Sequence, residues 1–153
     1  EVIIEETGGQ TLVVEGGTSD TYTVVLGVEP TAAVEVTAAP GDAEIDLGAG
    51  AGAAVTLTFT ASDWDTAQTI TVWAVDDDVY EGNPNHVTTI DHSVAGNGGN
   101  YEGVSAPSVD VEVEDNDLTC GDWGYLPEDL NRDCYVNLLD YAEFALEWLK
   151  TGP

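Results

Sequence analysis

Apolar and polar side chains alternate with a period of two through most of the chain between residues 10 and 114. The alternating runs are rich in Thr, Val and Ile, which is typical of half-buried β-strands, because successive side chains of a strand point to opposite faces. Turn residues such as Pro40-Gly41 separate the runs. The pattern predicts seven strands, over residues 12–15, 20–27, 32–38, 54–61, 68–75, 86–94 and 108–114. It therefore predicts a mainly β fold, a seven-stranded antiparallel Greek-key (Ig-like) β-sandwich.

The apolar positions that share one face of each predicted strand form the expected core. They are Tyr22, Val24, Leu26, Val34, Val36, Leu57, Phe59, Ile70, Val72, Val109, Val111 and Val113. Residues 48–54 have no such pattern and read GAGAGAA. We interpret this low-complexity segment as a flexible loop, with a tight bulge of small residues as the alternative.

The period changes after residue 118. Over residues 137–150 apolar side chains recur at spacings of three and four, while Glu143 and Glu147 fall on the opposite side, and this predicts a helix. Both cysteines and both basic residues also lie in this last part of the chain. We therefore expect two domains, a β-sandwich over 1–117 and a small module over 118–153.

The charge balance excludes several kinds of partner. Among 153 residues, 30 are Asp or Glu and two are Lys or Arg, which gives a formal net charge of -28. Such a chain repels phosphate backbones and anionic membrane surfaces, so we expect no nucleic-acid binding. No stretch approaches the roughly 18 apolar residues of a membrane span, so we expect no membrane insertion. The hydrophobic content of 42% is enough for a folded core. Because the chain starts at Glu1 and has no Met, we expect a piece of a longer protein.

Acidic side chains gather at the ends of three predicted strands. Residues 76–81 read DDDVYE after one strand, residues 114–117 read EDND after the last, and an early strand ends at Glu15. In a seven-stranded sandwich these ends can meet at one pole. Converging carboxylates repel one another, and Ca²⁺, which accepts six to eight oxygens in flexible geometry, relieves that repulsion. The alternative for the Asp triplet taken alone is a solvated acidic loop.

The sequences VEGG at 14–17, AVDDD at 74–78 and EDND at 114–117 resemble those of a Calx-beta domain. The resemblance covers about residues 1–117. Calx-beta domains are calcium-binding Greek-key sandwiches found in exchangers, integrins and large secreted bacterial proteins. The resemblance implies Ca²⁺ as cofactor, with Glu15, Asp76, Asp77, Asp78, Glu81, Asp115, Asn116 and Asp117 as ligands. A further carboxylate from the loop after the third strand belongs to the family pattern, and Asp42, Glu44 and Asp46 compete for that role.

Residues 129–140 read DLNRDCYVNLLD and are followed by the predicted helix. Oxygen side chains at positions 1, 3, 5, 9 and 12 of a twelve-residue loop are the ligand spacing of an EF-hand, with a backbone carbonyl at position 7. The predicted ligands are Asp129, Asn131, Asp133, Tyr135 through its carbonyl, Asn137 and Asp140. The alternative is an acidic helix N-terminus that Asn137 or Asp140 caps.

Asp at position 12 and the lack of a full incoming helix make this loop resemble a single dockerin repeat, a half EF-hand. The resemblance implies that the module anchors its parent protein to a partner such as a cohesin. Loop positions 10 and 11, Leu138 and Leu139, would then contact the partner. The alternative is that these leucines pack the helix onto the sandwich, which we favour for Leu138.

Position 6 of the loop is Cys134, where an EF-hand normally has Gly. A left-handed backbone costs a non-Gly residue about 1–2 kcal/mol, so we expect a covalent restraint there. Cys120 is the one available partner. A Cys120–Cys134 disulfide closing a loop of about 15 residues would contribute around 3 kcal/mol in the chain-entropy model. Its formation implies an oxidising compartment, and hence a secreted or cell-surface location.

No catalytic motif accompanies these metal-binding patterns. Asp91-His92-Ser93 lies on one predicted strand, where neighbouring side chains point to opposite faces, so it does not form a triad. We therefore predict a non-catalytic calcium-binding structural or interaction module of a larger secreted protein. The alternative is a carbohydrate-binding or accessory module of a secreted enzyme, with Trp64, Trp73 and Tyr80 as the platform.

Overall fold

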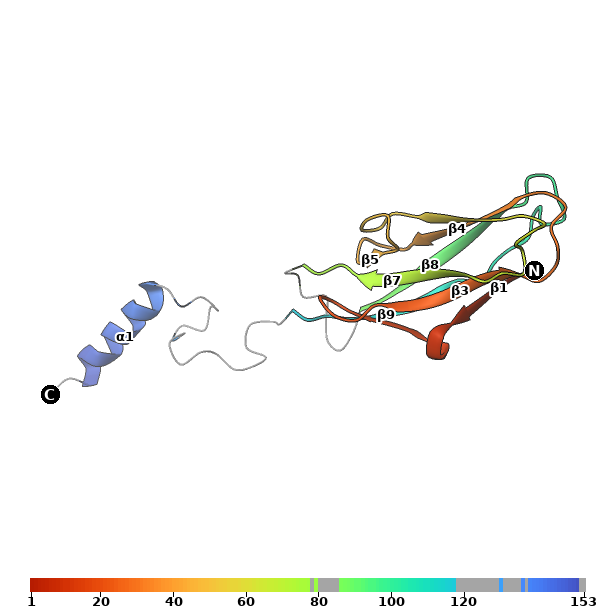
Figure 1. Cartoon of the computed structure of the whole chain (residues 1–153). Coiled ribbons are helices and arrows are strands. Elements are labelled where there is room, and N and C mark those ends of the chain that lie inside the picture. The colour runs from red at the N-terminus through yellow and green to blue at the C-terminus, as the bar shows by residue number, and fades with distance from the viewer. Residues whose placement is uncertain (78, 80–85, 118–129, 131–135, 137, 152–153) are drawn as a thin grey trace. The chain divides into compact units, whose positions relative to one another are not determined.

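The computed structural model describes residues 1–77, 79, 86–117, 130, 136 and 138–151. By contacts the chain divides into two compact units, 1–116 and 117–153, and each is described by itself. The first unit is a β-sandwich whose strands run along one long axis (Figure 1). Its strands are β1 (Val2–Glu6), β2 (Thr11–Val14), β3 (Asp20–Leu26), β4 (Val34–Pro40), β5 (Ile45–Asp46), β6 (Val55–Phe59), β7 (Gln68–Ala74), β8 (His86–Ala95) and β9 (Val109–Glu114).

Two sheets face each other across the core. One has the strand order β1-β3-β7-β5 and the other β2-β9-β8-β4-β6. The alternation of the sequence is the cause of this arrangement: along β9, Val109, Val111 and Val113 are buried while the acidic residues between them are exposed. The predicted core is buried as expected, except that Leu57 is half-buried against it. Tyr101, which the strand pattern did not mark, is also a core residue.

The mainly β, two-sheet prediction is confirmed, but its count and pairing differ in detail. The described residues contain two further strands, β1 and β5. β2 pairs with β9 in parallel, so the sheets are not purely antiparallel. β1 reads VIIEE without alternation, and β5 has two residues, too few to show a period. Neither strand therefore had a signal that period counting detects.

Residues 48–54 form a tight turn rather than a flexible loop. The carboxylate of Asp46 accepts hydrogen bonds from the backbone N–H groups of Gly48 and Gly50, at 2.6 and 2.9 Å, and Asp46 forms a bridge with Ala51. Gly50 has a φ of 107°, which a side chain would not tolerate. The small residues are needed for the turn, so the alternative interpretation was the better one.

The second unit contains the helix α1 (Leu138–Thr151), close to the range that the helical period predicts. Three aromatic side chains lie along it, and the rings of Phe144 and Trp148 are 5.9 Å apart between centroids. The contact-based division falls after Asn116, where the sequence predicted a boundary after residue 117. No helix among the described residues is long and apolar enough to cross a membrane.

Candidate metal centre

The ends of β2, β7 and β9 meet at one end of the sandwich, as the acidic sequence runs predicted. The backbone N–H of Glu15, directly after β2, donates to the carbonyl of Glu114 at 3.1 Å. The side chain of Asn116 donates to the carbonyl of Glu15 at 2.9 Å and to Oδ1 of Asp76, after β7, at 2.7 Å. We call this region the acidic pole and define it by Glu15, Glu44, Asp76, Asp77 and residues 115–117.

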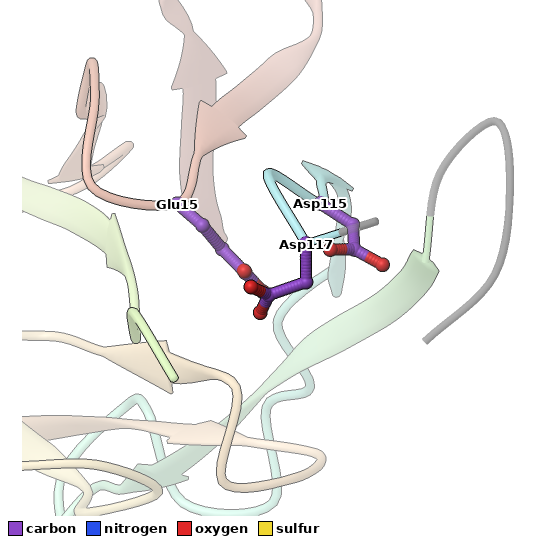
Figure 2. Close-up of side chains that lie close together, drawn as sticks. All are labelled: Glu15, Asp115 and Asp117. Carbon is purple, nitrogen blue, oxygen red and sulfur yellow. The ribbon is translucent and has the colours of Figure 1, made fainter. Parts of the chain in front are cut away.

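Three carboxylates of the acidic pole form its closest group. Glu15 reaches from the end of β2 toward Asp115 and Asp117, which follow β9 (Figure 2). One oxygen from each of the three lies within 4.8 Å of the others. Glu15 is only 2% exposed, and one oxygen of Asp117 is also buried. Burial of a carboxylate beside two others is costly unless positive charge is nearby.

The sandwich itself supplies little positive charge. Residues 1–116 contain no Lys or Arg, since the two basic residues of the chain are Arg132 and Lys150. The donors that converge are all hard oxygens, and no His or Cys belongs to the group of three. This chemistry fits a hard divalent cation, and Ca²⁺ tolerates the mixture of buried and half-buried carboxylates better than Mg²⁺, which demands a strict octahedron.

The Asp triplet is divided between different interactions. Asp76 is held by Asn116, and Oδ1 of Asp77 accepts a hydrogen bond from the N–H of Val79 at 2.7 Å. Both side chains are exposed at the rim of the acidic pole. The other two predicted ligands of this segment, Asp78 and Glu81, lie outside the described residues.

Glu44 belongs to the acidic pole, although the sequence did not single it out. Its carbonyl accepts a hydrogen bond from the N–H of Val75 at 2.8 Å, which places it beside the end of β7. Burial, and then the charges of Asp77 and Asp42, raise the pKa of Glu44, and Asp115 adds to this. Its Oε2 is buried without a hydrogen-bond partner among the described residues. A carboxylate in this position is suited to face a cation.

The other two acids of the same loop have different partners. Oδ2 of Asp42 lies 2.9 Å from Nε2 of His86, and Oδ1 accepts a hydrogen bond from the N–H of Glu44 at 3.1 Å. Burial opposes ionisation of Asp42, but hydrogen bonds from Thr88, His86 and that N–H outweigh it and lower its pKa. Asp46 closes the glycine turn. Asp42 and Asp46 thus have other partners, and Glu44 is the acid of this loop that lies near Asp77.

Little of the predicted EF-hand loop is described. Asp140, at position 12, is 3% exposed, and its Oδ1 accepts a hydrogen bond from the N–H of Leu130, at position 2, at 2.9 Å. Leu138 and Leu139 are exposed within this unit. The remaining predicted ligands, Asp129, Asn131, Asp133, Tyr135 and Asn137, lie outside the described residues, as do Cys120 and Cys134. The calcium loop and the disulfide stay predictions.

The two tryptophans of the carbohydrate-binding alternative have different environments. Trp64 is half-buried and packs against the hydrophobic core. Trp73, on β7, is 42% exposed. One of the two tryptophans is therefore a packing residue, and Tyr80, the third residue of the predicted platform, lies outside the described residues.

No protein-family model matches the chain, and no curated protein matches it. Among solved structures, the crystal structure of CBD12 from CALX1.2 has a TM-score of 0.50 at 20% identity, covering 74% of this chain and 44% of that one. The calcium binding domain CBD12 of CALX1.1 has a TM-score of 0.49 at 20% identity, covering 75% and 45%. The apo-form Calx CBD1 domain has a TM-score of 0.48 at 18% identity, covering 76% and 98%.

The chain spans less than half the length of the two CBD12 structures. At this sequence identity the likeness to CBD12 of CALX1.2 concerns the fold. The class that the fold defines is therefore a Calx-beta-like β-sandwich.

Proposed function

We propose that this chain is a non-catalytic, calcium-binding structural module of a larger secreted or cell-surface protein. The observation that carries the proposal is the convergence of Glu15, Asp115 and Asp117 at the end of a Calx-beta-like sandwich, with Glu15 almost fully buried.

The three converging carboxylates would hold the ion, with Glu44 and Asp77 close by. The ion supplies positive charge that residues 1–116 lack. Because Glu15 follows β2 while Asp115 and Asp117 follow β9, neutralising the three carboxylates stabilises the contact between the ends of these two strands. Calcium thus stiffens one end of the sandwich.

The test compares Asp115→Asn with Asp110→Asn. Asp115 lies in the converging group, whereas Asp110 is an exposed residue of β9 outside that group. Isothermal titration should show calcium binding to the native chain and to Asp110→Asn. Asp115→Asn should lose at least about tenfold in affinity, roughly 1.4 kcal/mol. Absence of calcium binding to the native chain, or equal affinity of the two variants, would contradict the proposal.

We also propose that residues 129–140 bind a second calcium ion as a dockerin-like half EF-hand, which positions α1 for docking to a partner domain such as a cohesin. The hydrogen bond between Leu130 and Asp140 supports it, because it joins positions 2 and 12 and so brings the loop ends together. Leu138 and Leu139, both exposed, would be the contact residues.

The second site is tested with Asp133→Asn, matched by Glu143→Gln on the exposed surface of α1. Both substitutions remove one negative charge from the same unit. Calcium titration should show one ion fewer for Asp133→Asn and an unchanged number for Glu143→Gln. An unchanged number of ions in Asp133→Asn would remove the loop from the proposal and leave the sandwich site untouched.

A further inference from the structure

Asn116, which the sequence predicts as an oxygen ligand, lies between Glu15 and Asp76, and its amide nitrogen faces both of them. Its Nδ2 donates to the backbone carbonyl of Glu15 at 2.9 Å and to Oδ1 of Asp76 at 2.7 Å. An amide nitrogen carries two N–H groups, so these two bonds use both. The amide therefore connects the segments that follow β2, β7 and β9.

The orientation of this amide follows from its partners. Turned by half a rotation, its oxygen would face the carboxylate of Asp76 and the carbonyl of Glu15, and two pairs of acceptors would repel each other. The donating orientation is thus the stable one when no cation is bound. A positively charged ion between the same two acceptors would satisfy them in the same way.

The backbone packs tightly around this connection. Gly16 has a φ of +59°, and a Cβ on it would lie 3.0 Å from Oδ1 of Asp76 and 3.1 Å from Nδ2 of Asn116. A side chain there would press on both groups, so the amide and the carboxylate lie directly against the turn after β2. The connection is a built part of the acidic pole.

We propose that the Asn116 amide takes the place of a cation between Asp76 and the end of β2. This inference rests on the proposed calcium site. The amide holds Asp76 in place before any ion binds, and it limits the number of ions that the pole accepts. Asn116 is a positioning residue, which sets the stoichiometry of the site without being a ligand.

The decisive variant is Asn116→Asp, which has nearly the same shape but no N–H donors. A carboxylate beside that of Asp76 recreates the need for positive charge. Without calcium, the unfolding midpoint should fall by roughly 4–8 °C or more, because a charge-assisted bond becomes a repulsion. With calcium, titration should show one ion more than the native chain binds, and the calcium-induced rise in the midpoint should be larger.

Two comparisons separate this role from a purely structural one. Asn116→Ala loses the same two hydrogen bonds but gains no ligand, so its calcium-free midpoint should fall while its number of ions stays that of the native chain. Asn97→Asp adds the same charge in the exposed loop between β8 and β9, where its amide donates to the carbonyl of Ala33, and should leave the number of ions unchanged.

An unchanged number of ions in Asn116→Asp would overturn the inference, whatever happens to stability. A native chain that binds no calcium would instead defeat the proposed function. In that case binding of an ion by Asn116→Asp alone would still support the substitution of amide for cation, and no binding by either would overturn it.

Discussion

Gly16 illustrates how a single position controls the acidic pole. Its left-handed backbone costs a non-Gly residue about 1–2 kcal/mol, and its Cβ would in addition press on Asp76 and Asn116. Gly8 has a similar φ of +76°, but nothing lies within 4 Å of its Cβ position. Both Gly→Ala variants should lose stability in chemical denaturation, and Gly16→Ala should lose more. Equal losses would mean that the close approach at Gly16 has no energetic weight.

A half-buried histidine, His92, connects the two sheets. Nδ1 of His92, on β8, lies 2.9 Å from the carbonyl of Pro107 and donates to it, so in the neutral ring Nε2 accepts the hydrogen bond from the Tyr22 hydroxyl, at 2.8 Å. Burial lowers the pKa of His92 and raises the pKa of Tyr22. The neutral imidazole is therefore the form that the folded sandwich prefers.

This preference predicts a loss of stability on acidification. The unfolded chain has a histidine pKa near about 6.5, above that of the folded chain, so it binds the proton first as the pH falls. The free energy of unfolding keeps its full value above about pH 6.5. Below that pH it falls by on the order of 1 kcal/mol, because the protonated ring no longer accepts the hydrogen bond from Tyr22. Denaturation in EDTA at stepped pH values should show this slope in the native chain and in His86→Gln, but not in His92→Gln. A slope retained in His92→Gln would exclude His92 as its source.

For single residues, the sequence predicts that acidic side chains gather at one pole better than it predicts which of them face an ion. The acidic runs at 76–81 and 114–117 were sufficient to place Asp76 and Asp115 at one pole. Asp42, Glu44 and Asp46 alternate along one short segment, and nothing local distinguishes them. Only pairing with β7, and the partners His86 and Gly48, show which of the three faces Asp77.

Among the elements, strands whose apolar and polar residues alternate strictly could be predicted from the sequence. Strands and pairings that depend on contacts distant in sequence could not. β3, β7 and β9 each carry a clear period, and all three were expected nearly at their observed bounds. β1 is an edge strand that pairs with β3, and its position depends on contacts distant in sequence. The parallel pairing of β2 with β9 joins residues about a hundred positions apart, which no local period encodes.

Tyr101 is one such distant contact. Its buried hydroxyl lies 2.9 Å from the carbonyl of Val28 and 3.1 Å from that of Glu1, and it accepts a hydrogen bond from the N–H of Val28 at 3.2 Å. It therefore fixes the start of β1 against the turn after β3.

Tyr101→Phe should leave the backbone N–H and carbonyl of Val28 without this partner and cost about 0.5–1.5 kcal/mol in the free energy of unfolding. Hydrogen exchange should accelerate in β1 more than in β7, because β1 is the strand that the hydroxyl fixes. Tyr141→Phe removes an exposed hydroxyl from α1 and serves as the control. Equal protection of β1 in Tyr101→Phe and the native chain would refute this role.

For the whole molecule, the charge is distributed unevenly between the two units. Residues 1–116 carry 22 of the 30 acids and no Lys or Arg, while residues 117–153 carry eight acids and both basic residues. Self-repulsion at such a charge destabilises the compact state, and dissolved salt screens it. The proposed function therefore predicts two effects of calcium on this chain, general screening and neutralisation of the acidic pole.

These two effects can be separated by unfolding at matched ionic strength. In EDTA, added NaCl should raise the unfolding midpoint gradually, because exposed carboxylates throughout the sandwich are screened. MgCl₂ should add little beyond NaCl, since the acidic pole suits flexible oxygen coordination rather than a strict octahedron. CaCl₂ should raise the midpoint further. When the calcium concentration is a hundred times the dissociation constant, binding adds about 2.7 kcal/mol to the free energy of unfolding. Asp115→Asn should lose this calcium increment while keeping the response to NaCl. Coincident curves for the three salts would show that screening alone accounts for the effect of calcium.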